Sequence, residues 1–417
     1  MKILFVHQNM PAQFKHLAPA LAEDGHQVRF LTQTVRAALP GVESEIYAAP
    51  PKSPPGHPYL GLLEPAVRNG QQVARALQAM QRKGFAPDLV IAHSGWGEPL
   101  FVKDVAPRAR LIVYAEYFYQ PRGADIGFDP EEPFSIDMVC RTRLKNAHLL
   151  AALEACDAAV TPTRWQRDSH PRPYWPKLRQ IHEGLDLGRL VRRPEASLRT
   201  PNGTLLQRGM PIVTYVARNL EPYRGLRTMV RAIPAILAAA PEAHIVLVGG
   251  RGTSYGRRPP SPHPDWLSAM QAEVPLDPAR VHCLGYLDYE RYLDLLSLSR
   301  AHVYLTYPFV LSWSMLEAMA MGAPLVASDT APVREVIQHG WNGLLTDFFD
   351  PDALARTVAG LLSGRMAASL TARARATVER QYPVERSLAE WRGLVAAVAG
   401  TEGAARRALP RRAAAAR

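Results

Sequence analysis

Two arginines six positions apart follow a run of apolar residues and could bind an anion. The run PIVTYVA (211–217) predicts a buried strand, so Arg218 would lie at its end and Arg224 in the loop that follows. A guanidinium group can bind two oxygens of one phosphate through parallel hydrogen bonds, so either residue could hold a phosphate. The alternative interpretation is that both are ordinary surface arginines of a basic protein.

The stretch HVYLTYPFVLSWSMLEAMAMGAPLVAS (302–328) has the order strand, loop, short helix, strand. A loop at the carboxyl end of a parallel strand, followed by a helix N-terminus, is where open α/β sheets bind phosphorylated ligands. The helix is predicted to begin at Ser314 and to end before Gly322. Glu317, in its first turn, could contact a ribose. Ser314 and Glu317 also have the spacing of a capping box, which is a purely structural role.

With these residues the chain resembles the retaining glycosyltransferases of family 4. The segment LEAMAMGAPLVAS is similar to the second half of the donor-binding signature of that family. The resemblance extends over essentially the whole chain and is strongest over 212–226 and 302–345.

The first glutamate of that signature is missing, because its position falls on Phe309. An aromatic ring packs on the apolar face of a sugar but cannot accept hydrogen bonds from its hydroxyls as a carboxylate does. We therefore expect another polar side chain, such as Glu183 or Ser312, to replace the missing contact to the donor sugar.

The resemblance implies a GT-B fold, an α/β architecture in which two doubly wound, Rossmann-like domains face an interdomain cleft. It implies transfer of a sugar with retention from a UDP- or GDP-linked donor, with no other cofactor. The implied acceptor is a glycan, a lipid-linked molecule or a small molecule, as in cell-envelope or polysaccharide biosynthesis. Arg218 and Arg224 are implied as catalytic groups on the diphosphate. The implied donor-binding residues are these two arginines with Ser312, Trp313, Ser314, Met315, Leu316 and Glu317.

Two other classes of function remain open at this point. A nucleotide-sugar 2-epimerase of the same fold would use similar donor contacts but would consume donor without any acceptor. A non-catalytic protein that binds sugar nucleotides or glycans would follow if Phe309 marks a loss of chemistry. Such a protein would bind the nucleotide without releasing it from a donor.

Candidate groups in the first half of the chain follow predicted strands. The loop after the first strand carries Gln8, Asn9 and Gln13, and the resemblance implies that it contacts the acceptor or the donor phosphates. His93 and Glu116 lie at the ends of two later strands and are the further catalytic candidates. A single histidine in such a position is more often structural than catalytic.

The length of the chain predicts two domains, because 417 residues exceed one ordinary core. Strand–helix alternation occurs twice, separated by the polar segment 190–211. We expect an N-terminal domain over 1–195 on the acceptor side and a C-terminal domain over 208–382 on the donor side. The helix at 383–400 is expected to pack back on the first domain. The basic tail, 401–417, is expected to be disordered.

A net charge of +11 suits an anionic donor and would favour a peripheral contact with an anionic membrane surface. Nucleic acid is a poorer fit, because no recognised binding motif accompanies the charge. The three cysteines lack metal or redox spacing, which indicates the cytoplasm. No apolar run approaches the roughly 20 residues that span a bilayer.

No metal site is predicted. Metal-dependent transferases need an Asp-x-Asp at the end of a strand, and no such motif occurs there. The sequence Asp350-Pro-Asp352 is interpreted instead as the N-cap of a helix.

Overall fold

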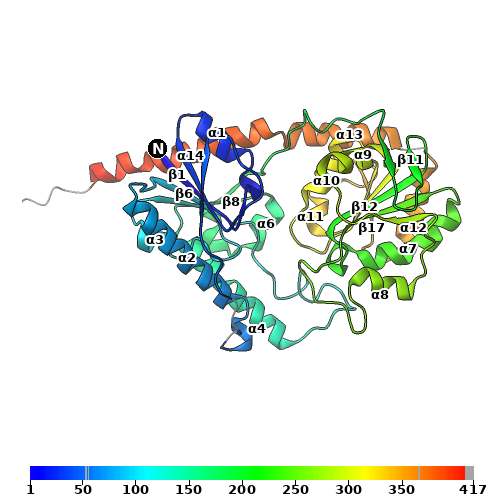
Figure 1. Ribbon diagram of the computed structural model, residues 1–417, viewed down its shortest axis with the longest axis horizontal. Coiled ribbons are helices and arrows are strands. Elements are labelled where there is room, and N and C mark those ends of the chain that lie inside the picture. Colours follow the sequence, from blue (N-terminus) through cyan, green and yellow to red (C-terminus); the bar gives the residue numbers. More distant parts are fainter. Residues whose placement is uncertain (52–53, 55, 365–366, 409–417) are drawn as a thin grey trace, which may run out of the picture. The chain divides into compact units, whose positions relative to one another are not determined.

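The computed structural model describes residues 1–51, 54, 56–364 and 367–408, with side chains described up to residue 400. The chain divides into two compact units, which are drawn in Figure 1. Unit 1 contains Met1–Pro121, Phe134–Gly184 and the chain from Val384 onward, and unit 2 contains Arg122–Pro133 and Leu185–Pro383.

Unit 1 is built on a sheet of seven parallel strands. Their order is β5 (Val42–Ile46), β3 (Gln27–Thr32), β1 (Lys2–Val6), β6 (Leu89–His93), β7 (Arg110–Tyr114), β8 (Ala158–Thr161) and β9 (Leu178–Gln180). The central strands are continuous apolar runs, as expected for a parallel sheet that helices cover on both faces. The chain order reverses between β1 and β6, and such a switch point is where open α/β sheets bind ligands beyond the carboxyl ends of the strands.

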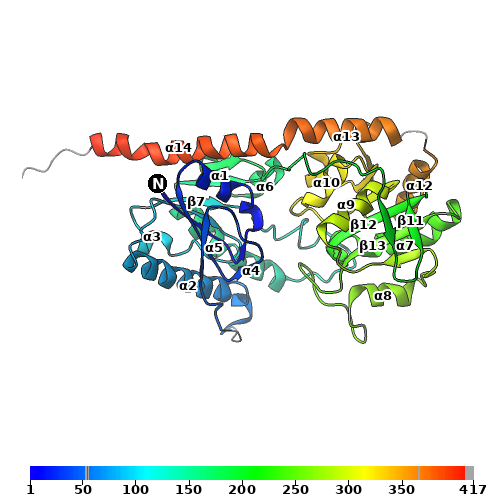
Figure 2. The same ribbon diagram turned by 45° about the horizontal axis from the view of Figure 1, so that its top comes forward.

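Helices cover both faces of this sheet. One face forms a core with α2 (Leu63–Arg82) and α5 (Ala147–Ala155), and the other with α1 (Leu17–Glu23) and α14 (Val384–Ala408). Figure 2 shows α14 running over α1. The remaining elements are α3 (Val102–Val105), α4 (Ile136–Lys145), α6 (Arg164–Ser169), the 3-10 helices η1 (Ala12–Phe14), η2 (Pro58–Leu60) and η3 (Arg172–Lys177), and the paired short strands β2 (Asn9–Met10) and β4 (Thr34–Val35).

The helix α14 is part of unit 1. It packs Trp391 and Val395 into the core that contains Phe5, and Arg392 forms an ion pair of 2.6 Å with Asp24. The helix continues to Ala408, so the first part of the tail expected to be disordered is helical. The alanines and arginines there are good helix formers. Residues 409–417 lie outside the described residues.

Two segments expected in the first domain belong to unit 2. They are 122–133 and 185–195. The second contributes Leu185 and Leu190 to a core of unit 2, and the backbone N–H of Leu185 donates to the carbonyl of Tyr382 at 2.8 Å. The break between the units therefore follows hydrophobic packing rather than the polar segment that marked it in the sequence.

Unit 2 is built on six parallel strands. Their order is β14 (Val281–Cys283), β13 (His244–Gly250), β12 (Ile212–Asn219), β15 (Ala301–Tyr304), β16 (Leu325–Ser328) and β17 (Leu344–Thr346). The chain order reverses between β12 and β15. A separate antiparallel pair is formed by β10 (Ser197–Arg199) and β11 (Leu205–Gln207).

Helices also cover both sides of this second sheet. A core cluster joins α9 (Tyr289–Leu298), α10 (Trp313–Ala320) and α13 (Ala367–Gln381) to the strands. On the opposite side in Figure 1 lie α7 (Leu226–Ala239) and α8 (Trp266–Glu273), and α7 packs against α12 (Pro351–Leu362). The interpretation of Asp350 as an N-cap is confirmed, because its carboxylate accepts from the N–H of Ala353 at 2.8 Å at the start of α12. The short elements are η4 (Pro222–Arg224) and α11 (Ala331–Arg334).

Within the part of the chain that the structure describes, no helix has both the length and the apolar character that a membrane span requires.

Candidate functional site

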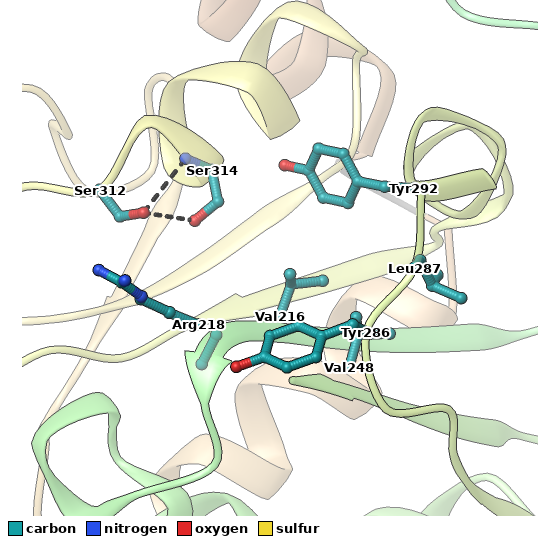
Figure 3. A pocket seen from close by; sticks show the side chains of 9 residues that line it. Val216, Arg218, Val248, Tyr286, Leu287, Tyr292, Ser312 and Ser314 are labelled. Atoms are coloured by element: carbon teal, nitrogen blue, oxygen red, sulfur yellow. Dashed lines mark hydrogen bonds between the residues drawn. The ribbon is translucent and has the colours of Figure 1, made fainter. Parts of the chain in front are cut away.

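A pocket of about 210 Å³ lies in unit 2 where the order of the sheet reverses. Figure 3 shows its walls, which come from the carboxyl ends of β12 and β13, the segment before α9, α9 itself and the start of α10. The residues that line it are Val216, Ala217, Arg218, Val248, Tyr286, Leu287, Tyr292, Ser312 and Ser314.

Arg218 supplies the charge of this pocket. It lies at the end of β12 with an exposed side chain. Among the residues that the structure describes, its guanidinium has no hydrogen-bond or ion-pair partner. Five guanidinium donors therefore face the pocket and solvent, which is an arrangement suited to a phosphate.

Arg224 has a different environment, although it follows Arg218 by six positions. Its side chain is buried, and its Nη1 donates to Thr306 Oγ1 at 2.7 Å and to the carbonyl of Val310 at 3.3 Å. Gly225, which follows it, has a φ of 74°, and a Cβ there would lie 2.3 Å from the Cβ of Leu305. Arg224 therefore holds the loops after β12 and β15 together and does not line the pocket.

The helix α10 begins one residue earlier than predicted. Its N-cap is Ser312, whose Oγ accepts from the N–H of Ser314 at 3.3 Å and lies 2.9 Å from the Oγ of Ser314. Both serines line the pocket at the N-terminus of α10 (Figure 3), and the helix dipole there favours an anion. Of the other expected donor-binding residues, Trp313 is half-buried, and Met315 and Leu316 are fully buried in the core.

The capping-box interpretation of Glu317 is wrong. With Ser312 as the N-cap, Glu317 lies in the fifth position of the helix and cannot return to the cap. Its two carboxylate oxygens accept instead from the hydroxyls of Tyr289 at 2.9 Å and Tyr292 at 3.0 Å. Burial first, and then the charge of Glu317, hold the pKa of Tyr292 well above its usual range. Tyr292 lines the pocket, so Glu317 lies directly behind its wall.

Phe309 does not line this pocket. It is 3% exposed and packs edge-on against Tyr223, with ring centroids 5.4 Å apart, and against Tyr255 at 5.0 Å. The idea that its ring stacks on a donor sugar is therefore not supported by its burial. Of the two proposed replacements, Ser312 lines the pocket. Glu183 belongs to unit 1, where it accepts from the hydroxyl of Tyr114.

Two histidines meet at the switch point of unit 1. His7 follows β1 and His93 ends β6, both are almost fully buried, and their rings lie 5.0 Å apart. The Nδ1 of His7 accepts from the N–H of Asn9 at 2.8 Å, and the Nδ1 of His93 accepts from the N–H of Gly95 at 3.0 Å. Each neutral ring therefore carries its proton on Nε2. Burial first, and then His93, hold the pKa of His7 well below its usual range.

Glu116 joins this pair to the loop after β1. Its Oε1 accepts from Gln13 Nε2 at 2.9 Å, and its Oε2 lies 3.6 Å from the Nε2 of His93. Trp96 covers the pair, stacked on His93 at 4.8 Å and itself 39% exposed. The structure thus brings Gln13, from η1, together with His93 and Glu116, which lie at or just after the ends of β6 and β7.

The other two expected residues of this loop have structural contacts. The carbonyl of Gln8 accepts from the N–H groups of Gln33 and Thr34. The Oδ1 of Asn9 accepts from the Nε of Arg36 at 3.1 Å. Both support the pairing of β2 with β4.

Several pocket residues of unit 2 were not predicted. Val248 lies near the carboxyl end of β13, Tyr286 and Leu287 follow β14, and Tyr292 lies on α9. The first three could have been predicted from the sequence, because they lie at or just after the carboxyl ends of strands in the same sheet as Arg218. No group of three or more His, Cys, Asp or Glu suited to a metal ion occurs among the described residues.

Comparison with known families accounts for this arrangement. Residues 24–190 match the glycosyl transferase family 4 group, and residues 210–364 match the glycosyl transferases group 1. The chain belongs to these glycosyltransferases. The prediction of a GT-B fold with two doubly wound, Rossmann-like domains is confirmed.

The curated relatives of this chain are distant. The D-inositol 3-phosphate glycosyltransferase of Nocardioides sp. is 28% identical over 195 residues, which are 43% of this chain and only 40% of the relative. The GDP-mannose-dependent alpha-(1-6)-phosphatidylinositol monomannoside mannosyltransferase of Mycobacterium tuberculosis is 25% identical over 305 residues, 69% of this chain and 70% of the relative.

Solved structures resemble this chain over most of its length. The sucrose-phosphate synthase of Thermosynechococcus elongatus has a TM-score of 0.72 at 19% identity, covering 95% of this chain and 100% of that one. Anabaena HepE in complex with UDP-glucose has a TM-score of 0.65 at 16% identity, covering 95% and 100%. At these identities the likeness shows the fold.

Proposed function

We propose that this protein transfers a sugar, with retention at the anomeric carbon, from a nucleotide-diphosphate donor to an acceptor hydroxyl. The observation that carries the proposal is Arg218, an exposed guanidinium that has no partner among the described residues and lines a pocket at the switch point. When the bond from the anomeric carbon to the phosphate oxygen breaks, the electron pair stays on the diphosphate. A fixed cation and the N-terminal N–H groups of α10 stabilise that charge.

The apolar and aromatic residues of the pocket are proposed to bind the base of the nucleotide. Val216, Val248 and Leu287 offer apolar surface for the base, and Tyr286 offers an aromatic face. Glu317 is proposed to act on the ribose, either directly or through the hydroxyl of Tyr292. Because its carboxylate can accept more than two hydrogen bonds, the contacts to Tyr289 and Tyr292 leave it capacity.

Arg224 is proposed to act on the diphosphate as a second positive charge from within the loop. Its guanidinium is anchored by Thr306, so it would supply a fixed charge and a fixed loop rather than a mobile contact. Preorganised charge of this kind costs no rearrangement when the leaving group forms.

For the nucleotide we propose a uridine or guanosine diphosphate. A UDP-glucose complex is known for Anabaena HepE, and the mycobacterial relative is named as GDP-mannose-dependent. The apolar wall of the pocket accepts either base. Donor competition is the direct test of this choice.

The acceptor is proposed to bind at the switch point of unit 1, and to present neutral hydroxyls there. Trp96 offers an exposed ring for the apolar face of a sugar, and Glu116 is a partly exposed carboxylate that accepts hydrogen bonds from hydroxyls. A phosphorylated acceptor would meet a like charge at Glu116. A glycan or lipid-linked sugar therefore fits better than an anionic small molecule.

A peripheral contact with the cytoplasmic face of a membrane remains a separate proposal, motivated by the net charge of +11. Basic residues near an anionic surface contribute about 1 kcal/mol each, and salt weakens the effect. The full chain and a chain without residues 401–417 should be sedimented with phosphatidylserine vesicles. Equal recovery of both in the supernatant would remove the proposal.

The central experiment incubates the protein with UDP- and GDP-sugars, with and without a panel of glycans, and measures nucleotide release. We expect release that requires one donor base and rises with a hydroxyl acceptor. Retention is read from the anomeric configuration of the product. Donor consumption without any acceptor, together with a new sugar epimer, would identify an epimerase instead.

A further inference from the structure

The segment Arg122–Pro133 belongs to unit 2 although the chain on both sides of it belongs to unit 1. Its sequence, RGADIGFDPEEP, combines one aromatic ring with four carboxylates. Phe128 packs among three aromatic rings of unit 2, with centroids 5.0–5.4 Å away: Tyr307, Phe348 and Phe349. The segment is therefore an integral part of the second unit.

Asp129 is the most deeply buried carboxylate of this segment, with 6% exposure. Its Oδ2 accepts from the hydroxyl of Tyr307 and from Nη1 of Arg227 at 2.9 Å. Burial first, and then the bond to Asp129, raise the pKa of Tyr307, so its hydroxyl stays a donor. Asp129 thereby fixes a residue of the loop after β15 to the first turn of α7.

Tyr307 transmits this constraint to the loop that carries Arg224. Its N–H donates to the carbonyl of Tyr223 at 3.0 Å, and the two rings are stacked 4.5 Å apart. The hydroxyl of Tyr223 in turn donates to the carbonyl of Asp125 at 3.3 Å. Arg224 follows Tyr223 directly and lies over the ring of Phe309 at 5.9 Å. The segment therefore reaches η4 directly through Asp125 and indirectly through Tyr307.

The same contacts remove Arg227 from the set of arginines that could bind a phosphate. Its Nη2 donates to Glu132 at 2.7 Å while Nη1 donates to Asp129, and its guanidinium lies over Trp266 at 4.7 Å. A guanidinium with two carboxylates is neutralised. Of Arg218, Arg224 and Arg227, only Arg218 lacks such engagement among the described residues.

We propose that Asp129 is a positioning residue for the donor site, acting through Tyr307 on the loop that carries Arg224. This inference rests on the proposed function, because the loop matters to catalysis only if a diphosphate binds beside it. It assigns the segment 122–133, which lies between two elements of unit 1 in the sequence, to donor binding. Packing of Phe128 against the aromatic rings and burial of Asp129 hold Tyr223 and Tyr307 in one arrangement, so the loop is in place before the donor arrives.

The test compares Asp129→Ala, Asp129→Asn and Tyr307→Phe with the parent in the full chain. Isothermal calorimetry measures UDP and GDP binding, and initial rates measure kcat and KM for donor and acceptor separately. We expect Asp129→Ala and Tyr307→Phe each to lower kcat/KM for the donor about tenfold, with the KM for the acceptor unchanged. Asp129→Asn still accepts from Tyr307 and should retain most of the activity.

Two comparisons separate positioning from mere stability. Glu131→Ala is the matched control, because it removes ion pairs of the same segment with Arg231 and, at 3.8 Å, with Arg227, but keeps the hydrogen bond between Asp129 and Tyr307. Its kcat/KM should stay within about twofold of the parent. The double variant Asp129→Ala with Tyr307→Phe should lose no more than the larger single loss, since both act through one contact. The inference would be overturned if Glu131→Ala lowered kcat/KM for the donor as much as Asp129→Ala does. It would also be overturned if the loss in the double variant were the sum of the two single losses in free energy.

Failure of the inference can be told from failure of the proposed function. Variants that bind and turn over donor like an active parent overturn the inference alone. A parent that binds neither UDP nor GDP overturns the proposed function and the inference with it. Tyr307→Phe removes only a hydroxyl and keeps the stacked ring, so the comparison stands even if Asp129→Ala does not fold.

Discussion

The two switch points of this molecule share a topology and differ in charge. In unit 2 the strand ends surround a pocket with two serine hydroxyls, a helix N-terminus and a guanidinium that has no partner among the described residues. In unit 1 the strand ends carry two buried imidazoles, an amide and a carboxylate that contact one another. The first arrangement favours an anion, and the second does not.

The difference indicates how one fold can divide two substrates between two similar sheets. Parallel strands supply the same edge in both units, and only the residue at each strand end sets the charge. An arginine at the end of β12 suits a diphosphate. The histidines at the ends of β1 and β6, held as Nε2–H tautomers beside Glu116, suit neutral hydroxyl groups.

The largest effect is expected from Arg218→Ala. Charge-assisted contacts to a phosphate are worth about 1.5–3 kcal/mol, so donor turnover should fall about ten- to a hundredfold or more. The melting temperature should not change, because the side chain is exposed. Arg208→Ala, another exposed arginine of unit 2, is the control. If the Arg218→Ala protein turned over donor as fast as the parent, Arg218 would not bind the diphosphate.

Arg224→Ala should behave differently from Arg218→Ala despite the shared motif. It removes a buried guanidinium that binds Thr306 and Val310, so the free energy of unfolding should fall by about 1–3 kcal/mol together with donor turnover. Urea unfolding of both variants measures the difference. An Arg224→Ala protein as stable as the parent would contradict the observed burial.

Glu116→Gln tests the other side of the comparison. We expect the KM for the acceptor to rise about tenfold, because an amide is a weaker acceptor for hydroxyls than a carboxylate. The dissociation constant for the nucleotide should be unchanged. Glu23→Gln, on the exposed end of α1, is the control in the same unit. A change in nucleotide affinity instead would mean that the two sites are not separate.

Glu317→Gln tests whether the carboxylate behind the pocket wall contributes to nucleotide binding. The amide keeps one acceptor for the hydroxyls of Tyr289 and Tyr292 but loses the charge. We expect nucleotide affinity to fall by up to about tenfold, with a small loss of stability. Calorimetry with UDP and GDP measures the nucleotide affinity, and thermal unfolding measures the stability. Unchanged affinity with a large fall in melting temperature would assign Glu317 a structural role only.

The smallest effect concerns a buried carboxyl in unit 1. Burial raises the pKa of Glu98 to about 7, above its usual 4.5, so the folded state holds a proton that the unfolded state releases. The stability of the parent should therefore fall as pH rises from about 4.5 to 7 and stay low above that range. Glu98→Gln removes this dependence, so its stability relative to the parent should be greater at pH 8 than at pH 5. Urea unfolding at both values is the measurement, and a constant difference would contradict the assignment.

Much of this molecule could be predicted from local patterns. Apolar strand runs alternating with helices predicted two doubly wound domains, because a parallel sheet buries both faces and leaves that pattern in the chain. The positions of Arg218, His93 and Glu116 at strand ends predicted where they lie, since the carboxyl ends of parallel strands share one edge. The residues of LEAMAMGAPLVAS were sufficient to indicate the family.

Contacts between distant segments could not be predicted in the same way. The sequence presents Arg218 and Arg224 as a pair, yet one is exposed and the other is buried against Thr306. It presents Glu317 as a cap, yet two tyrosines more than 20 positions away in the chain bind it. It places 122–133 within the first half, yet Asp129 packs into unit 2. Strand ends and periodicity are local properties of the chain, whereas the partner of a buried polar group depends on which segments the hydrophobic cores bring together.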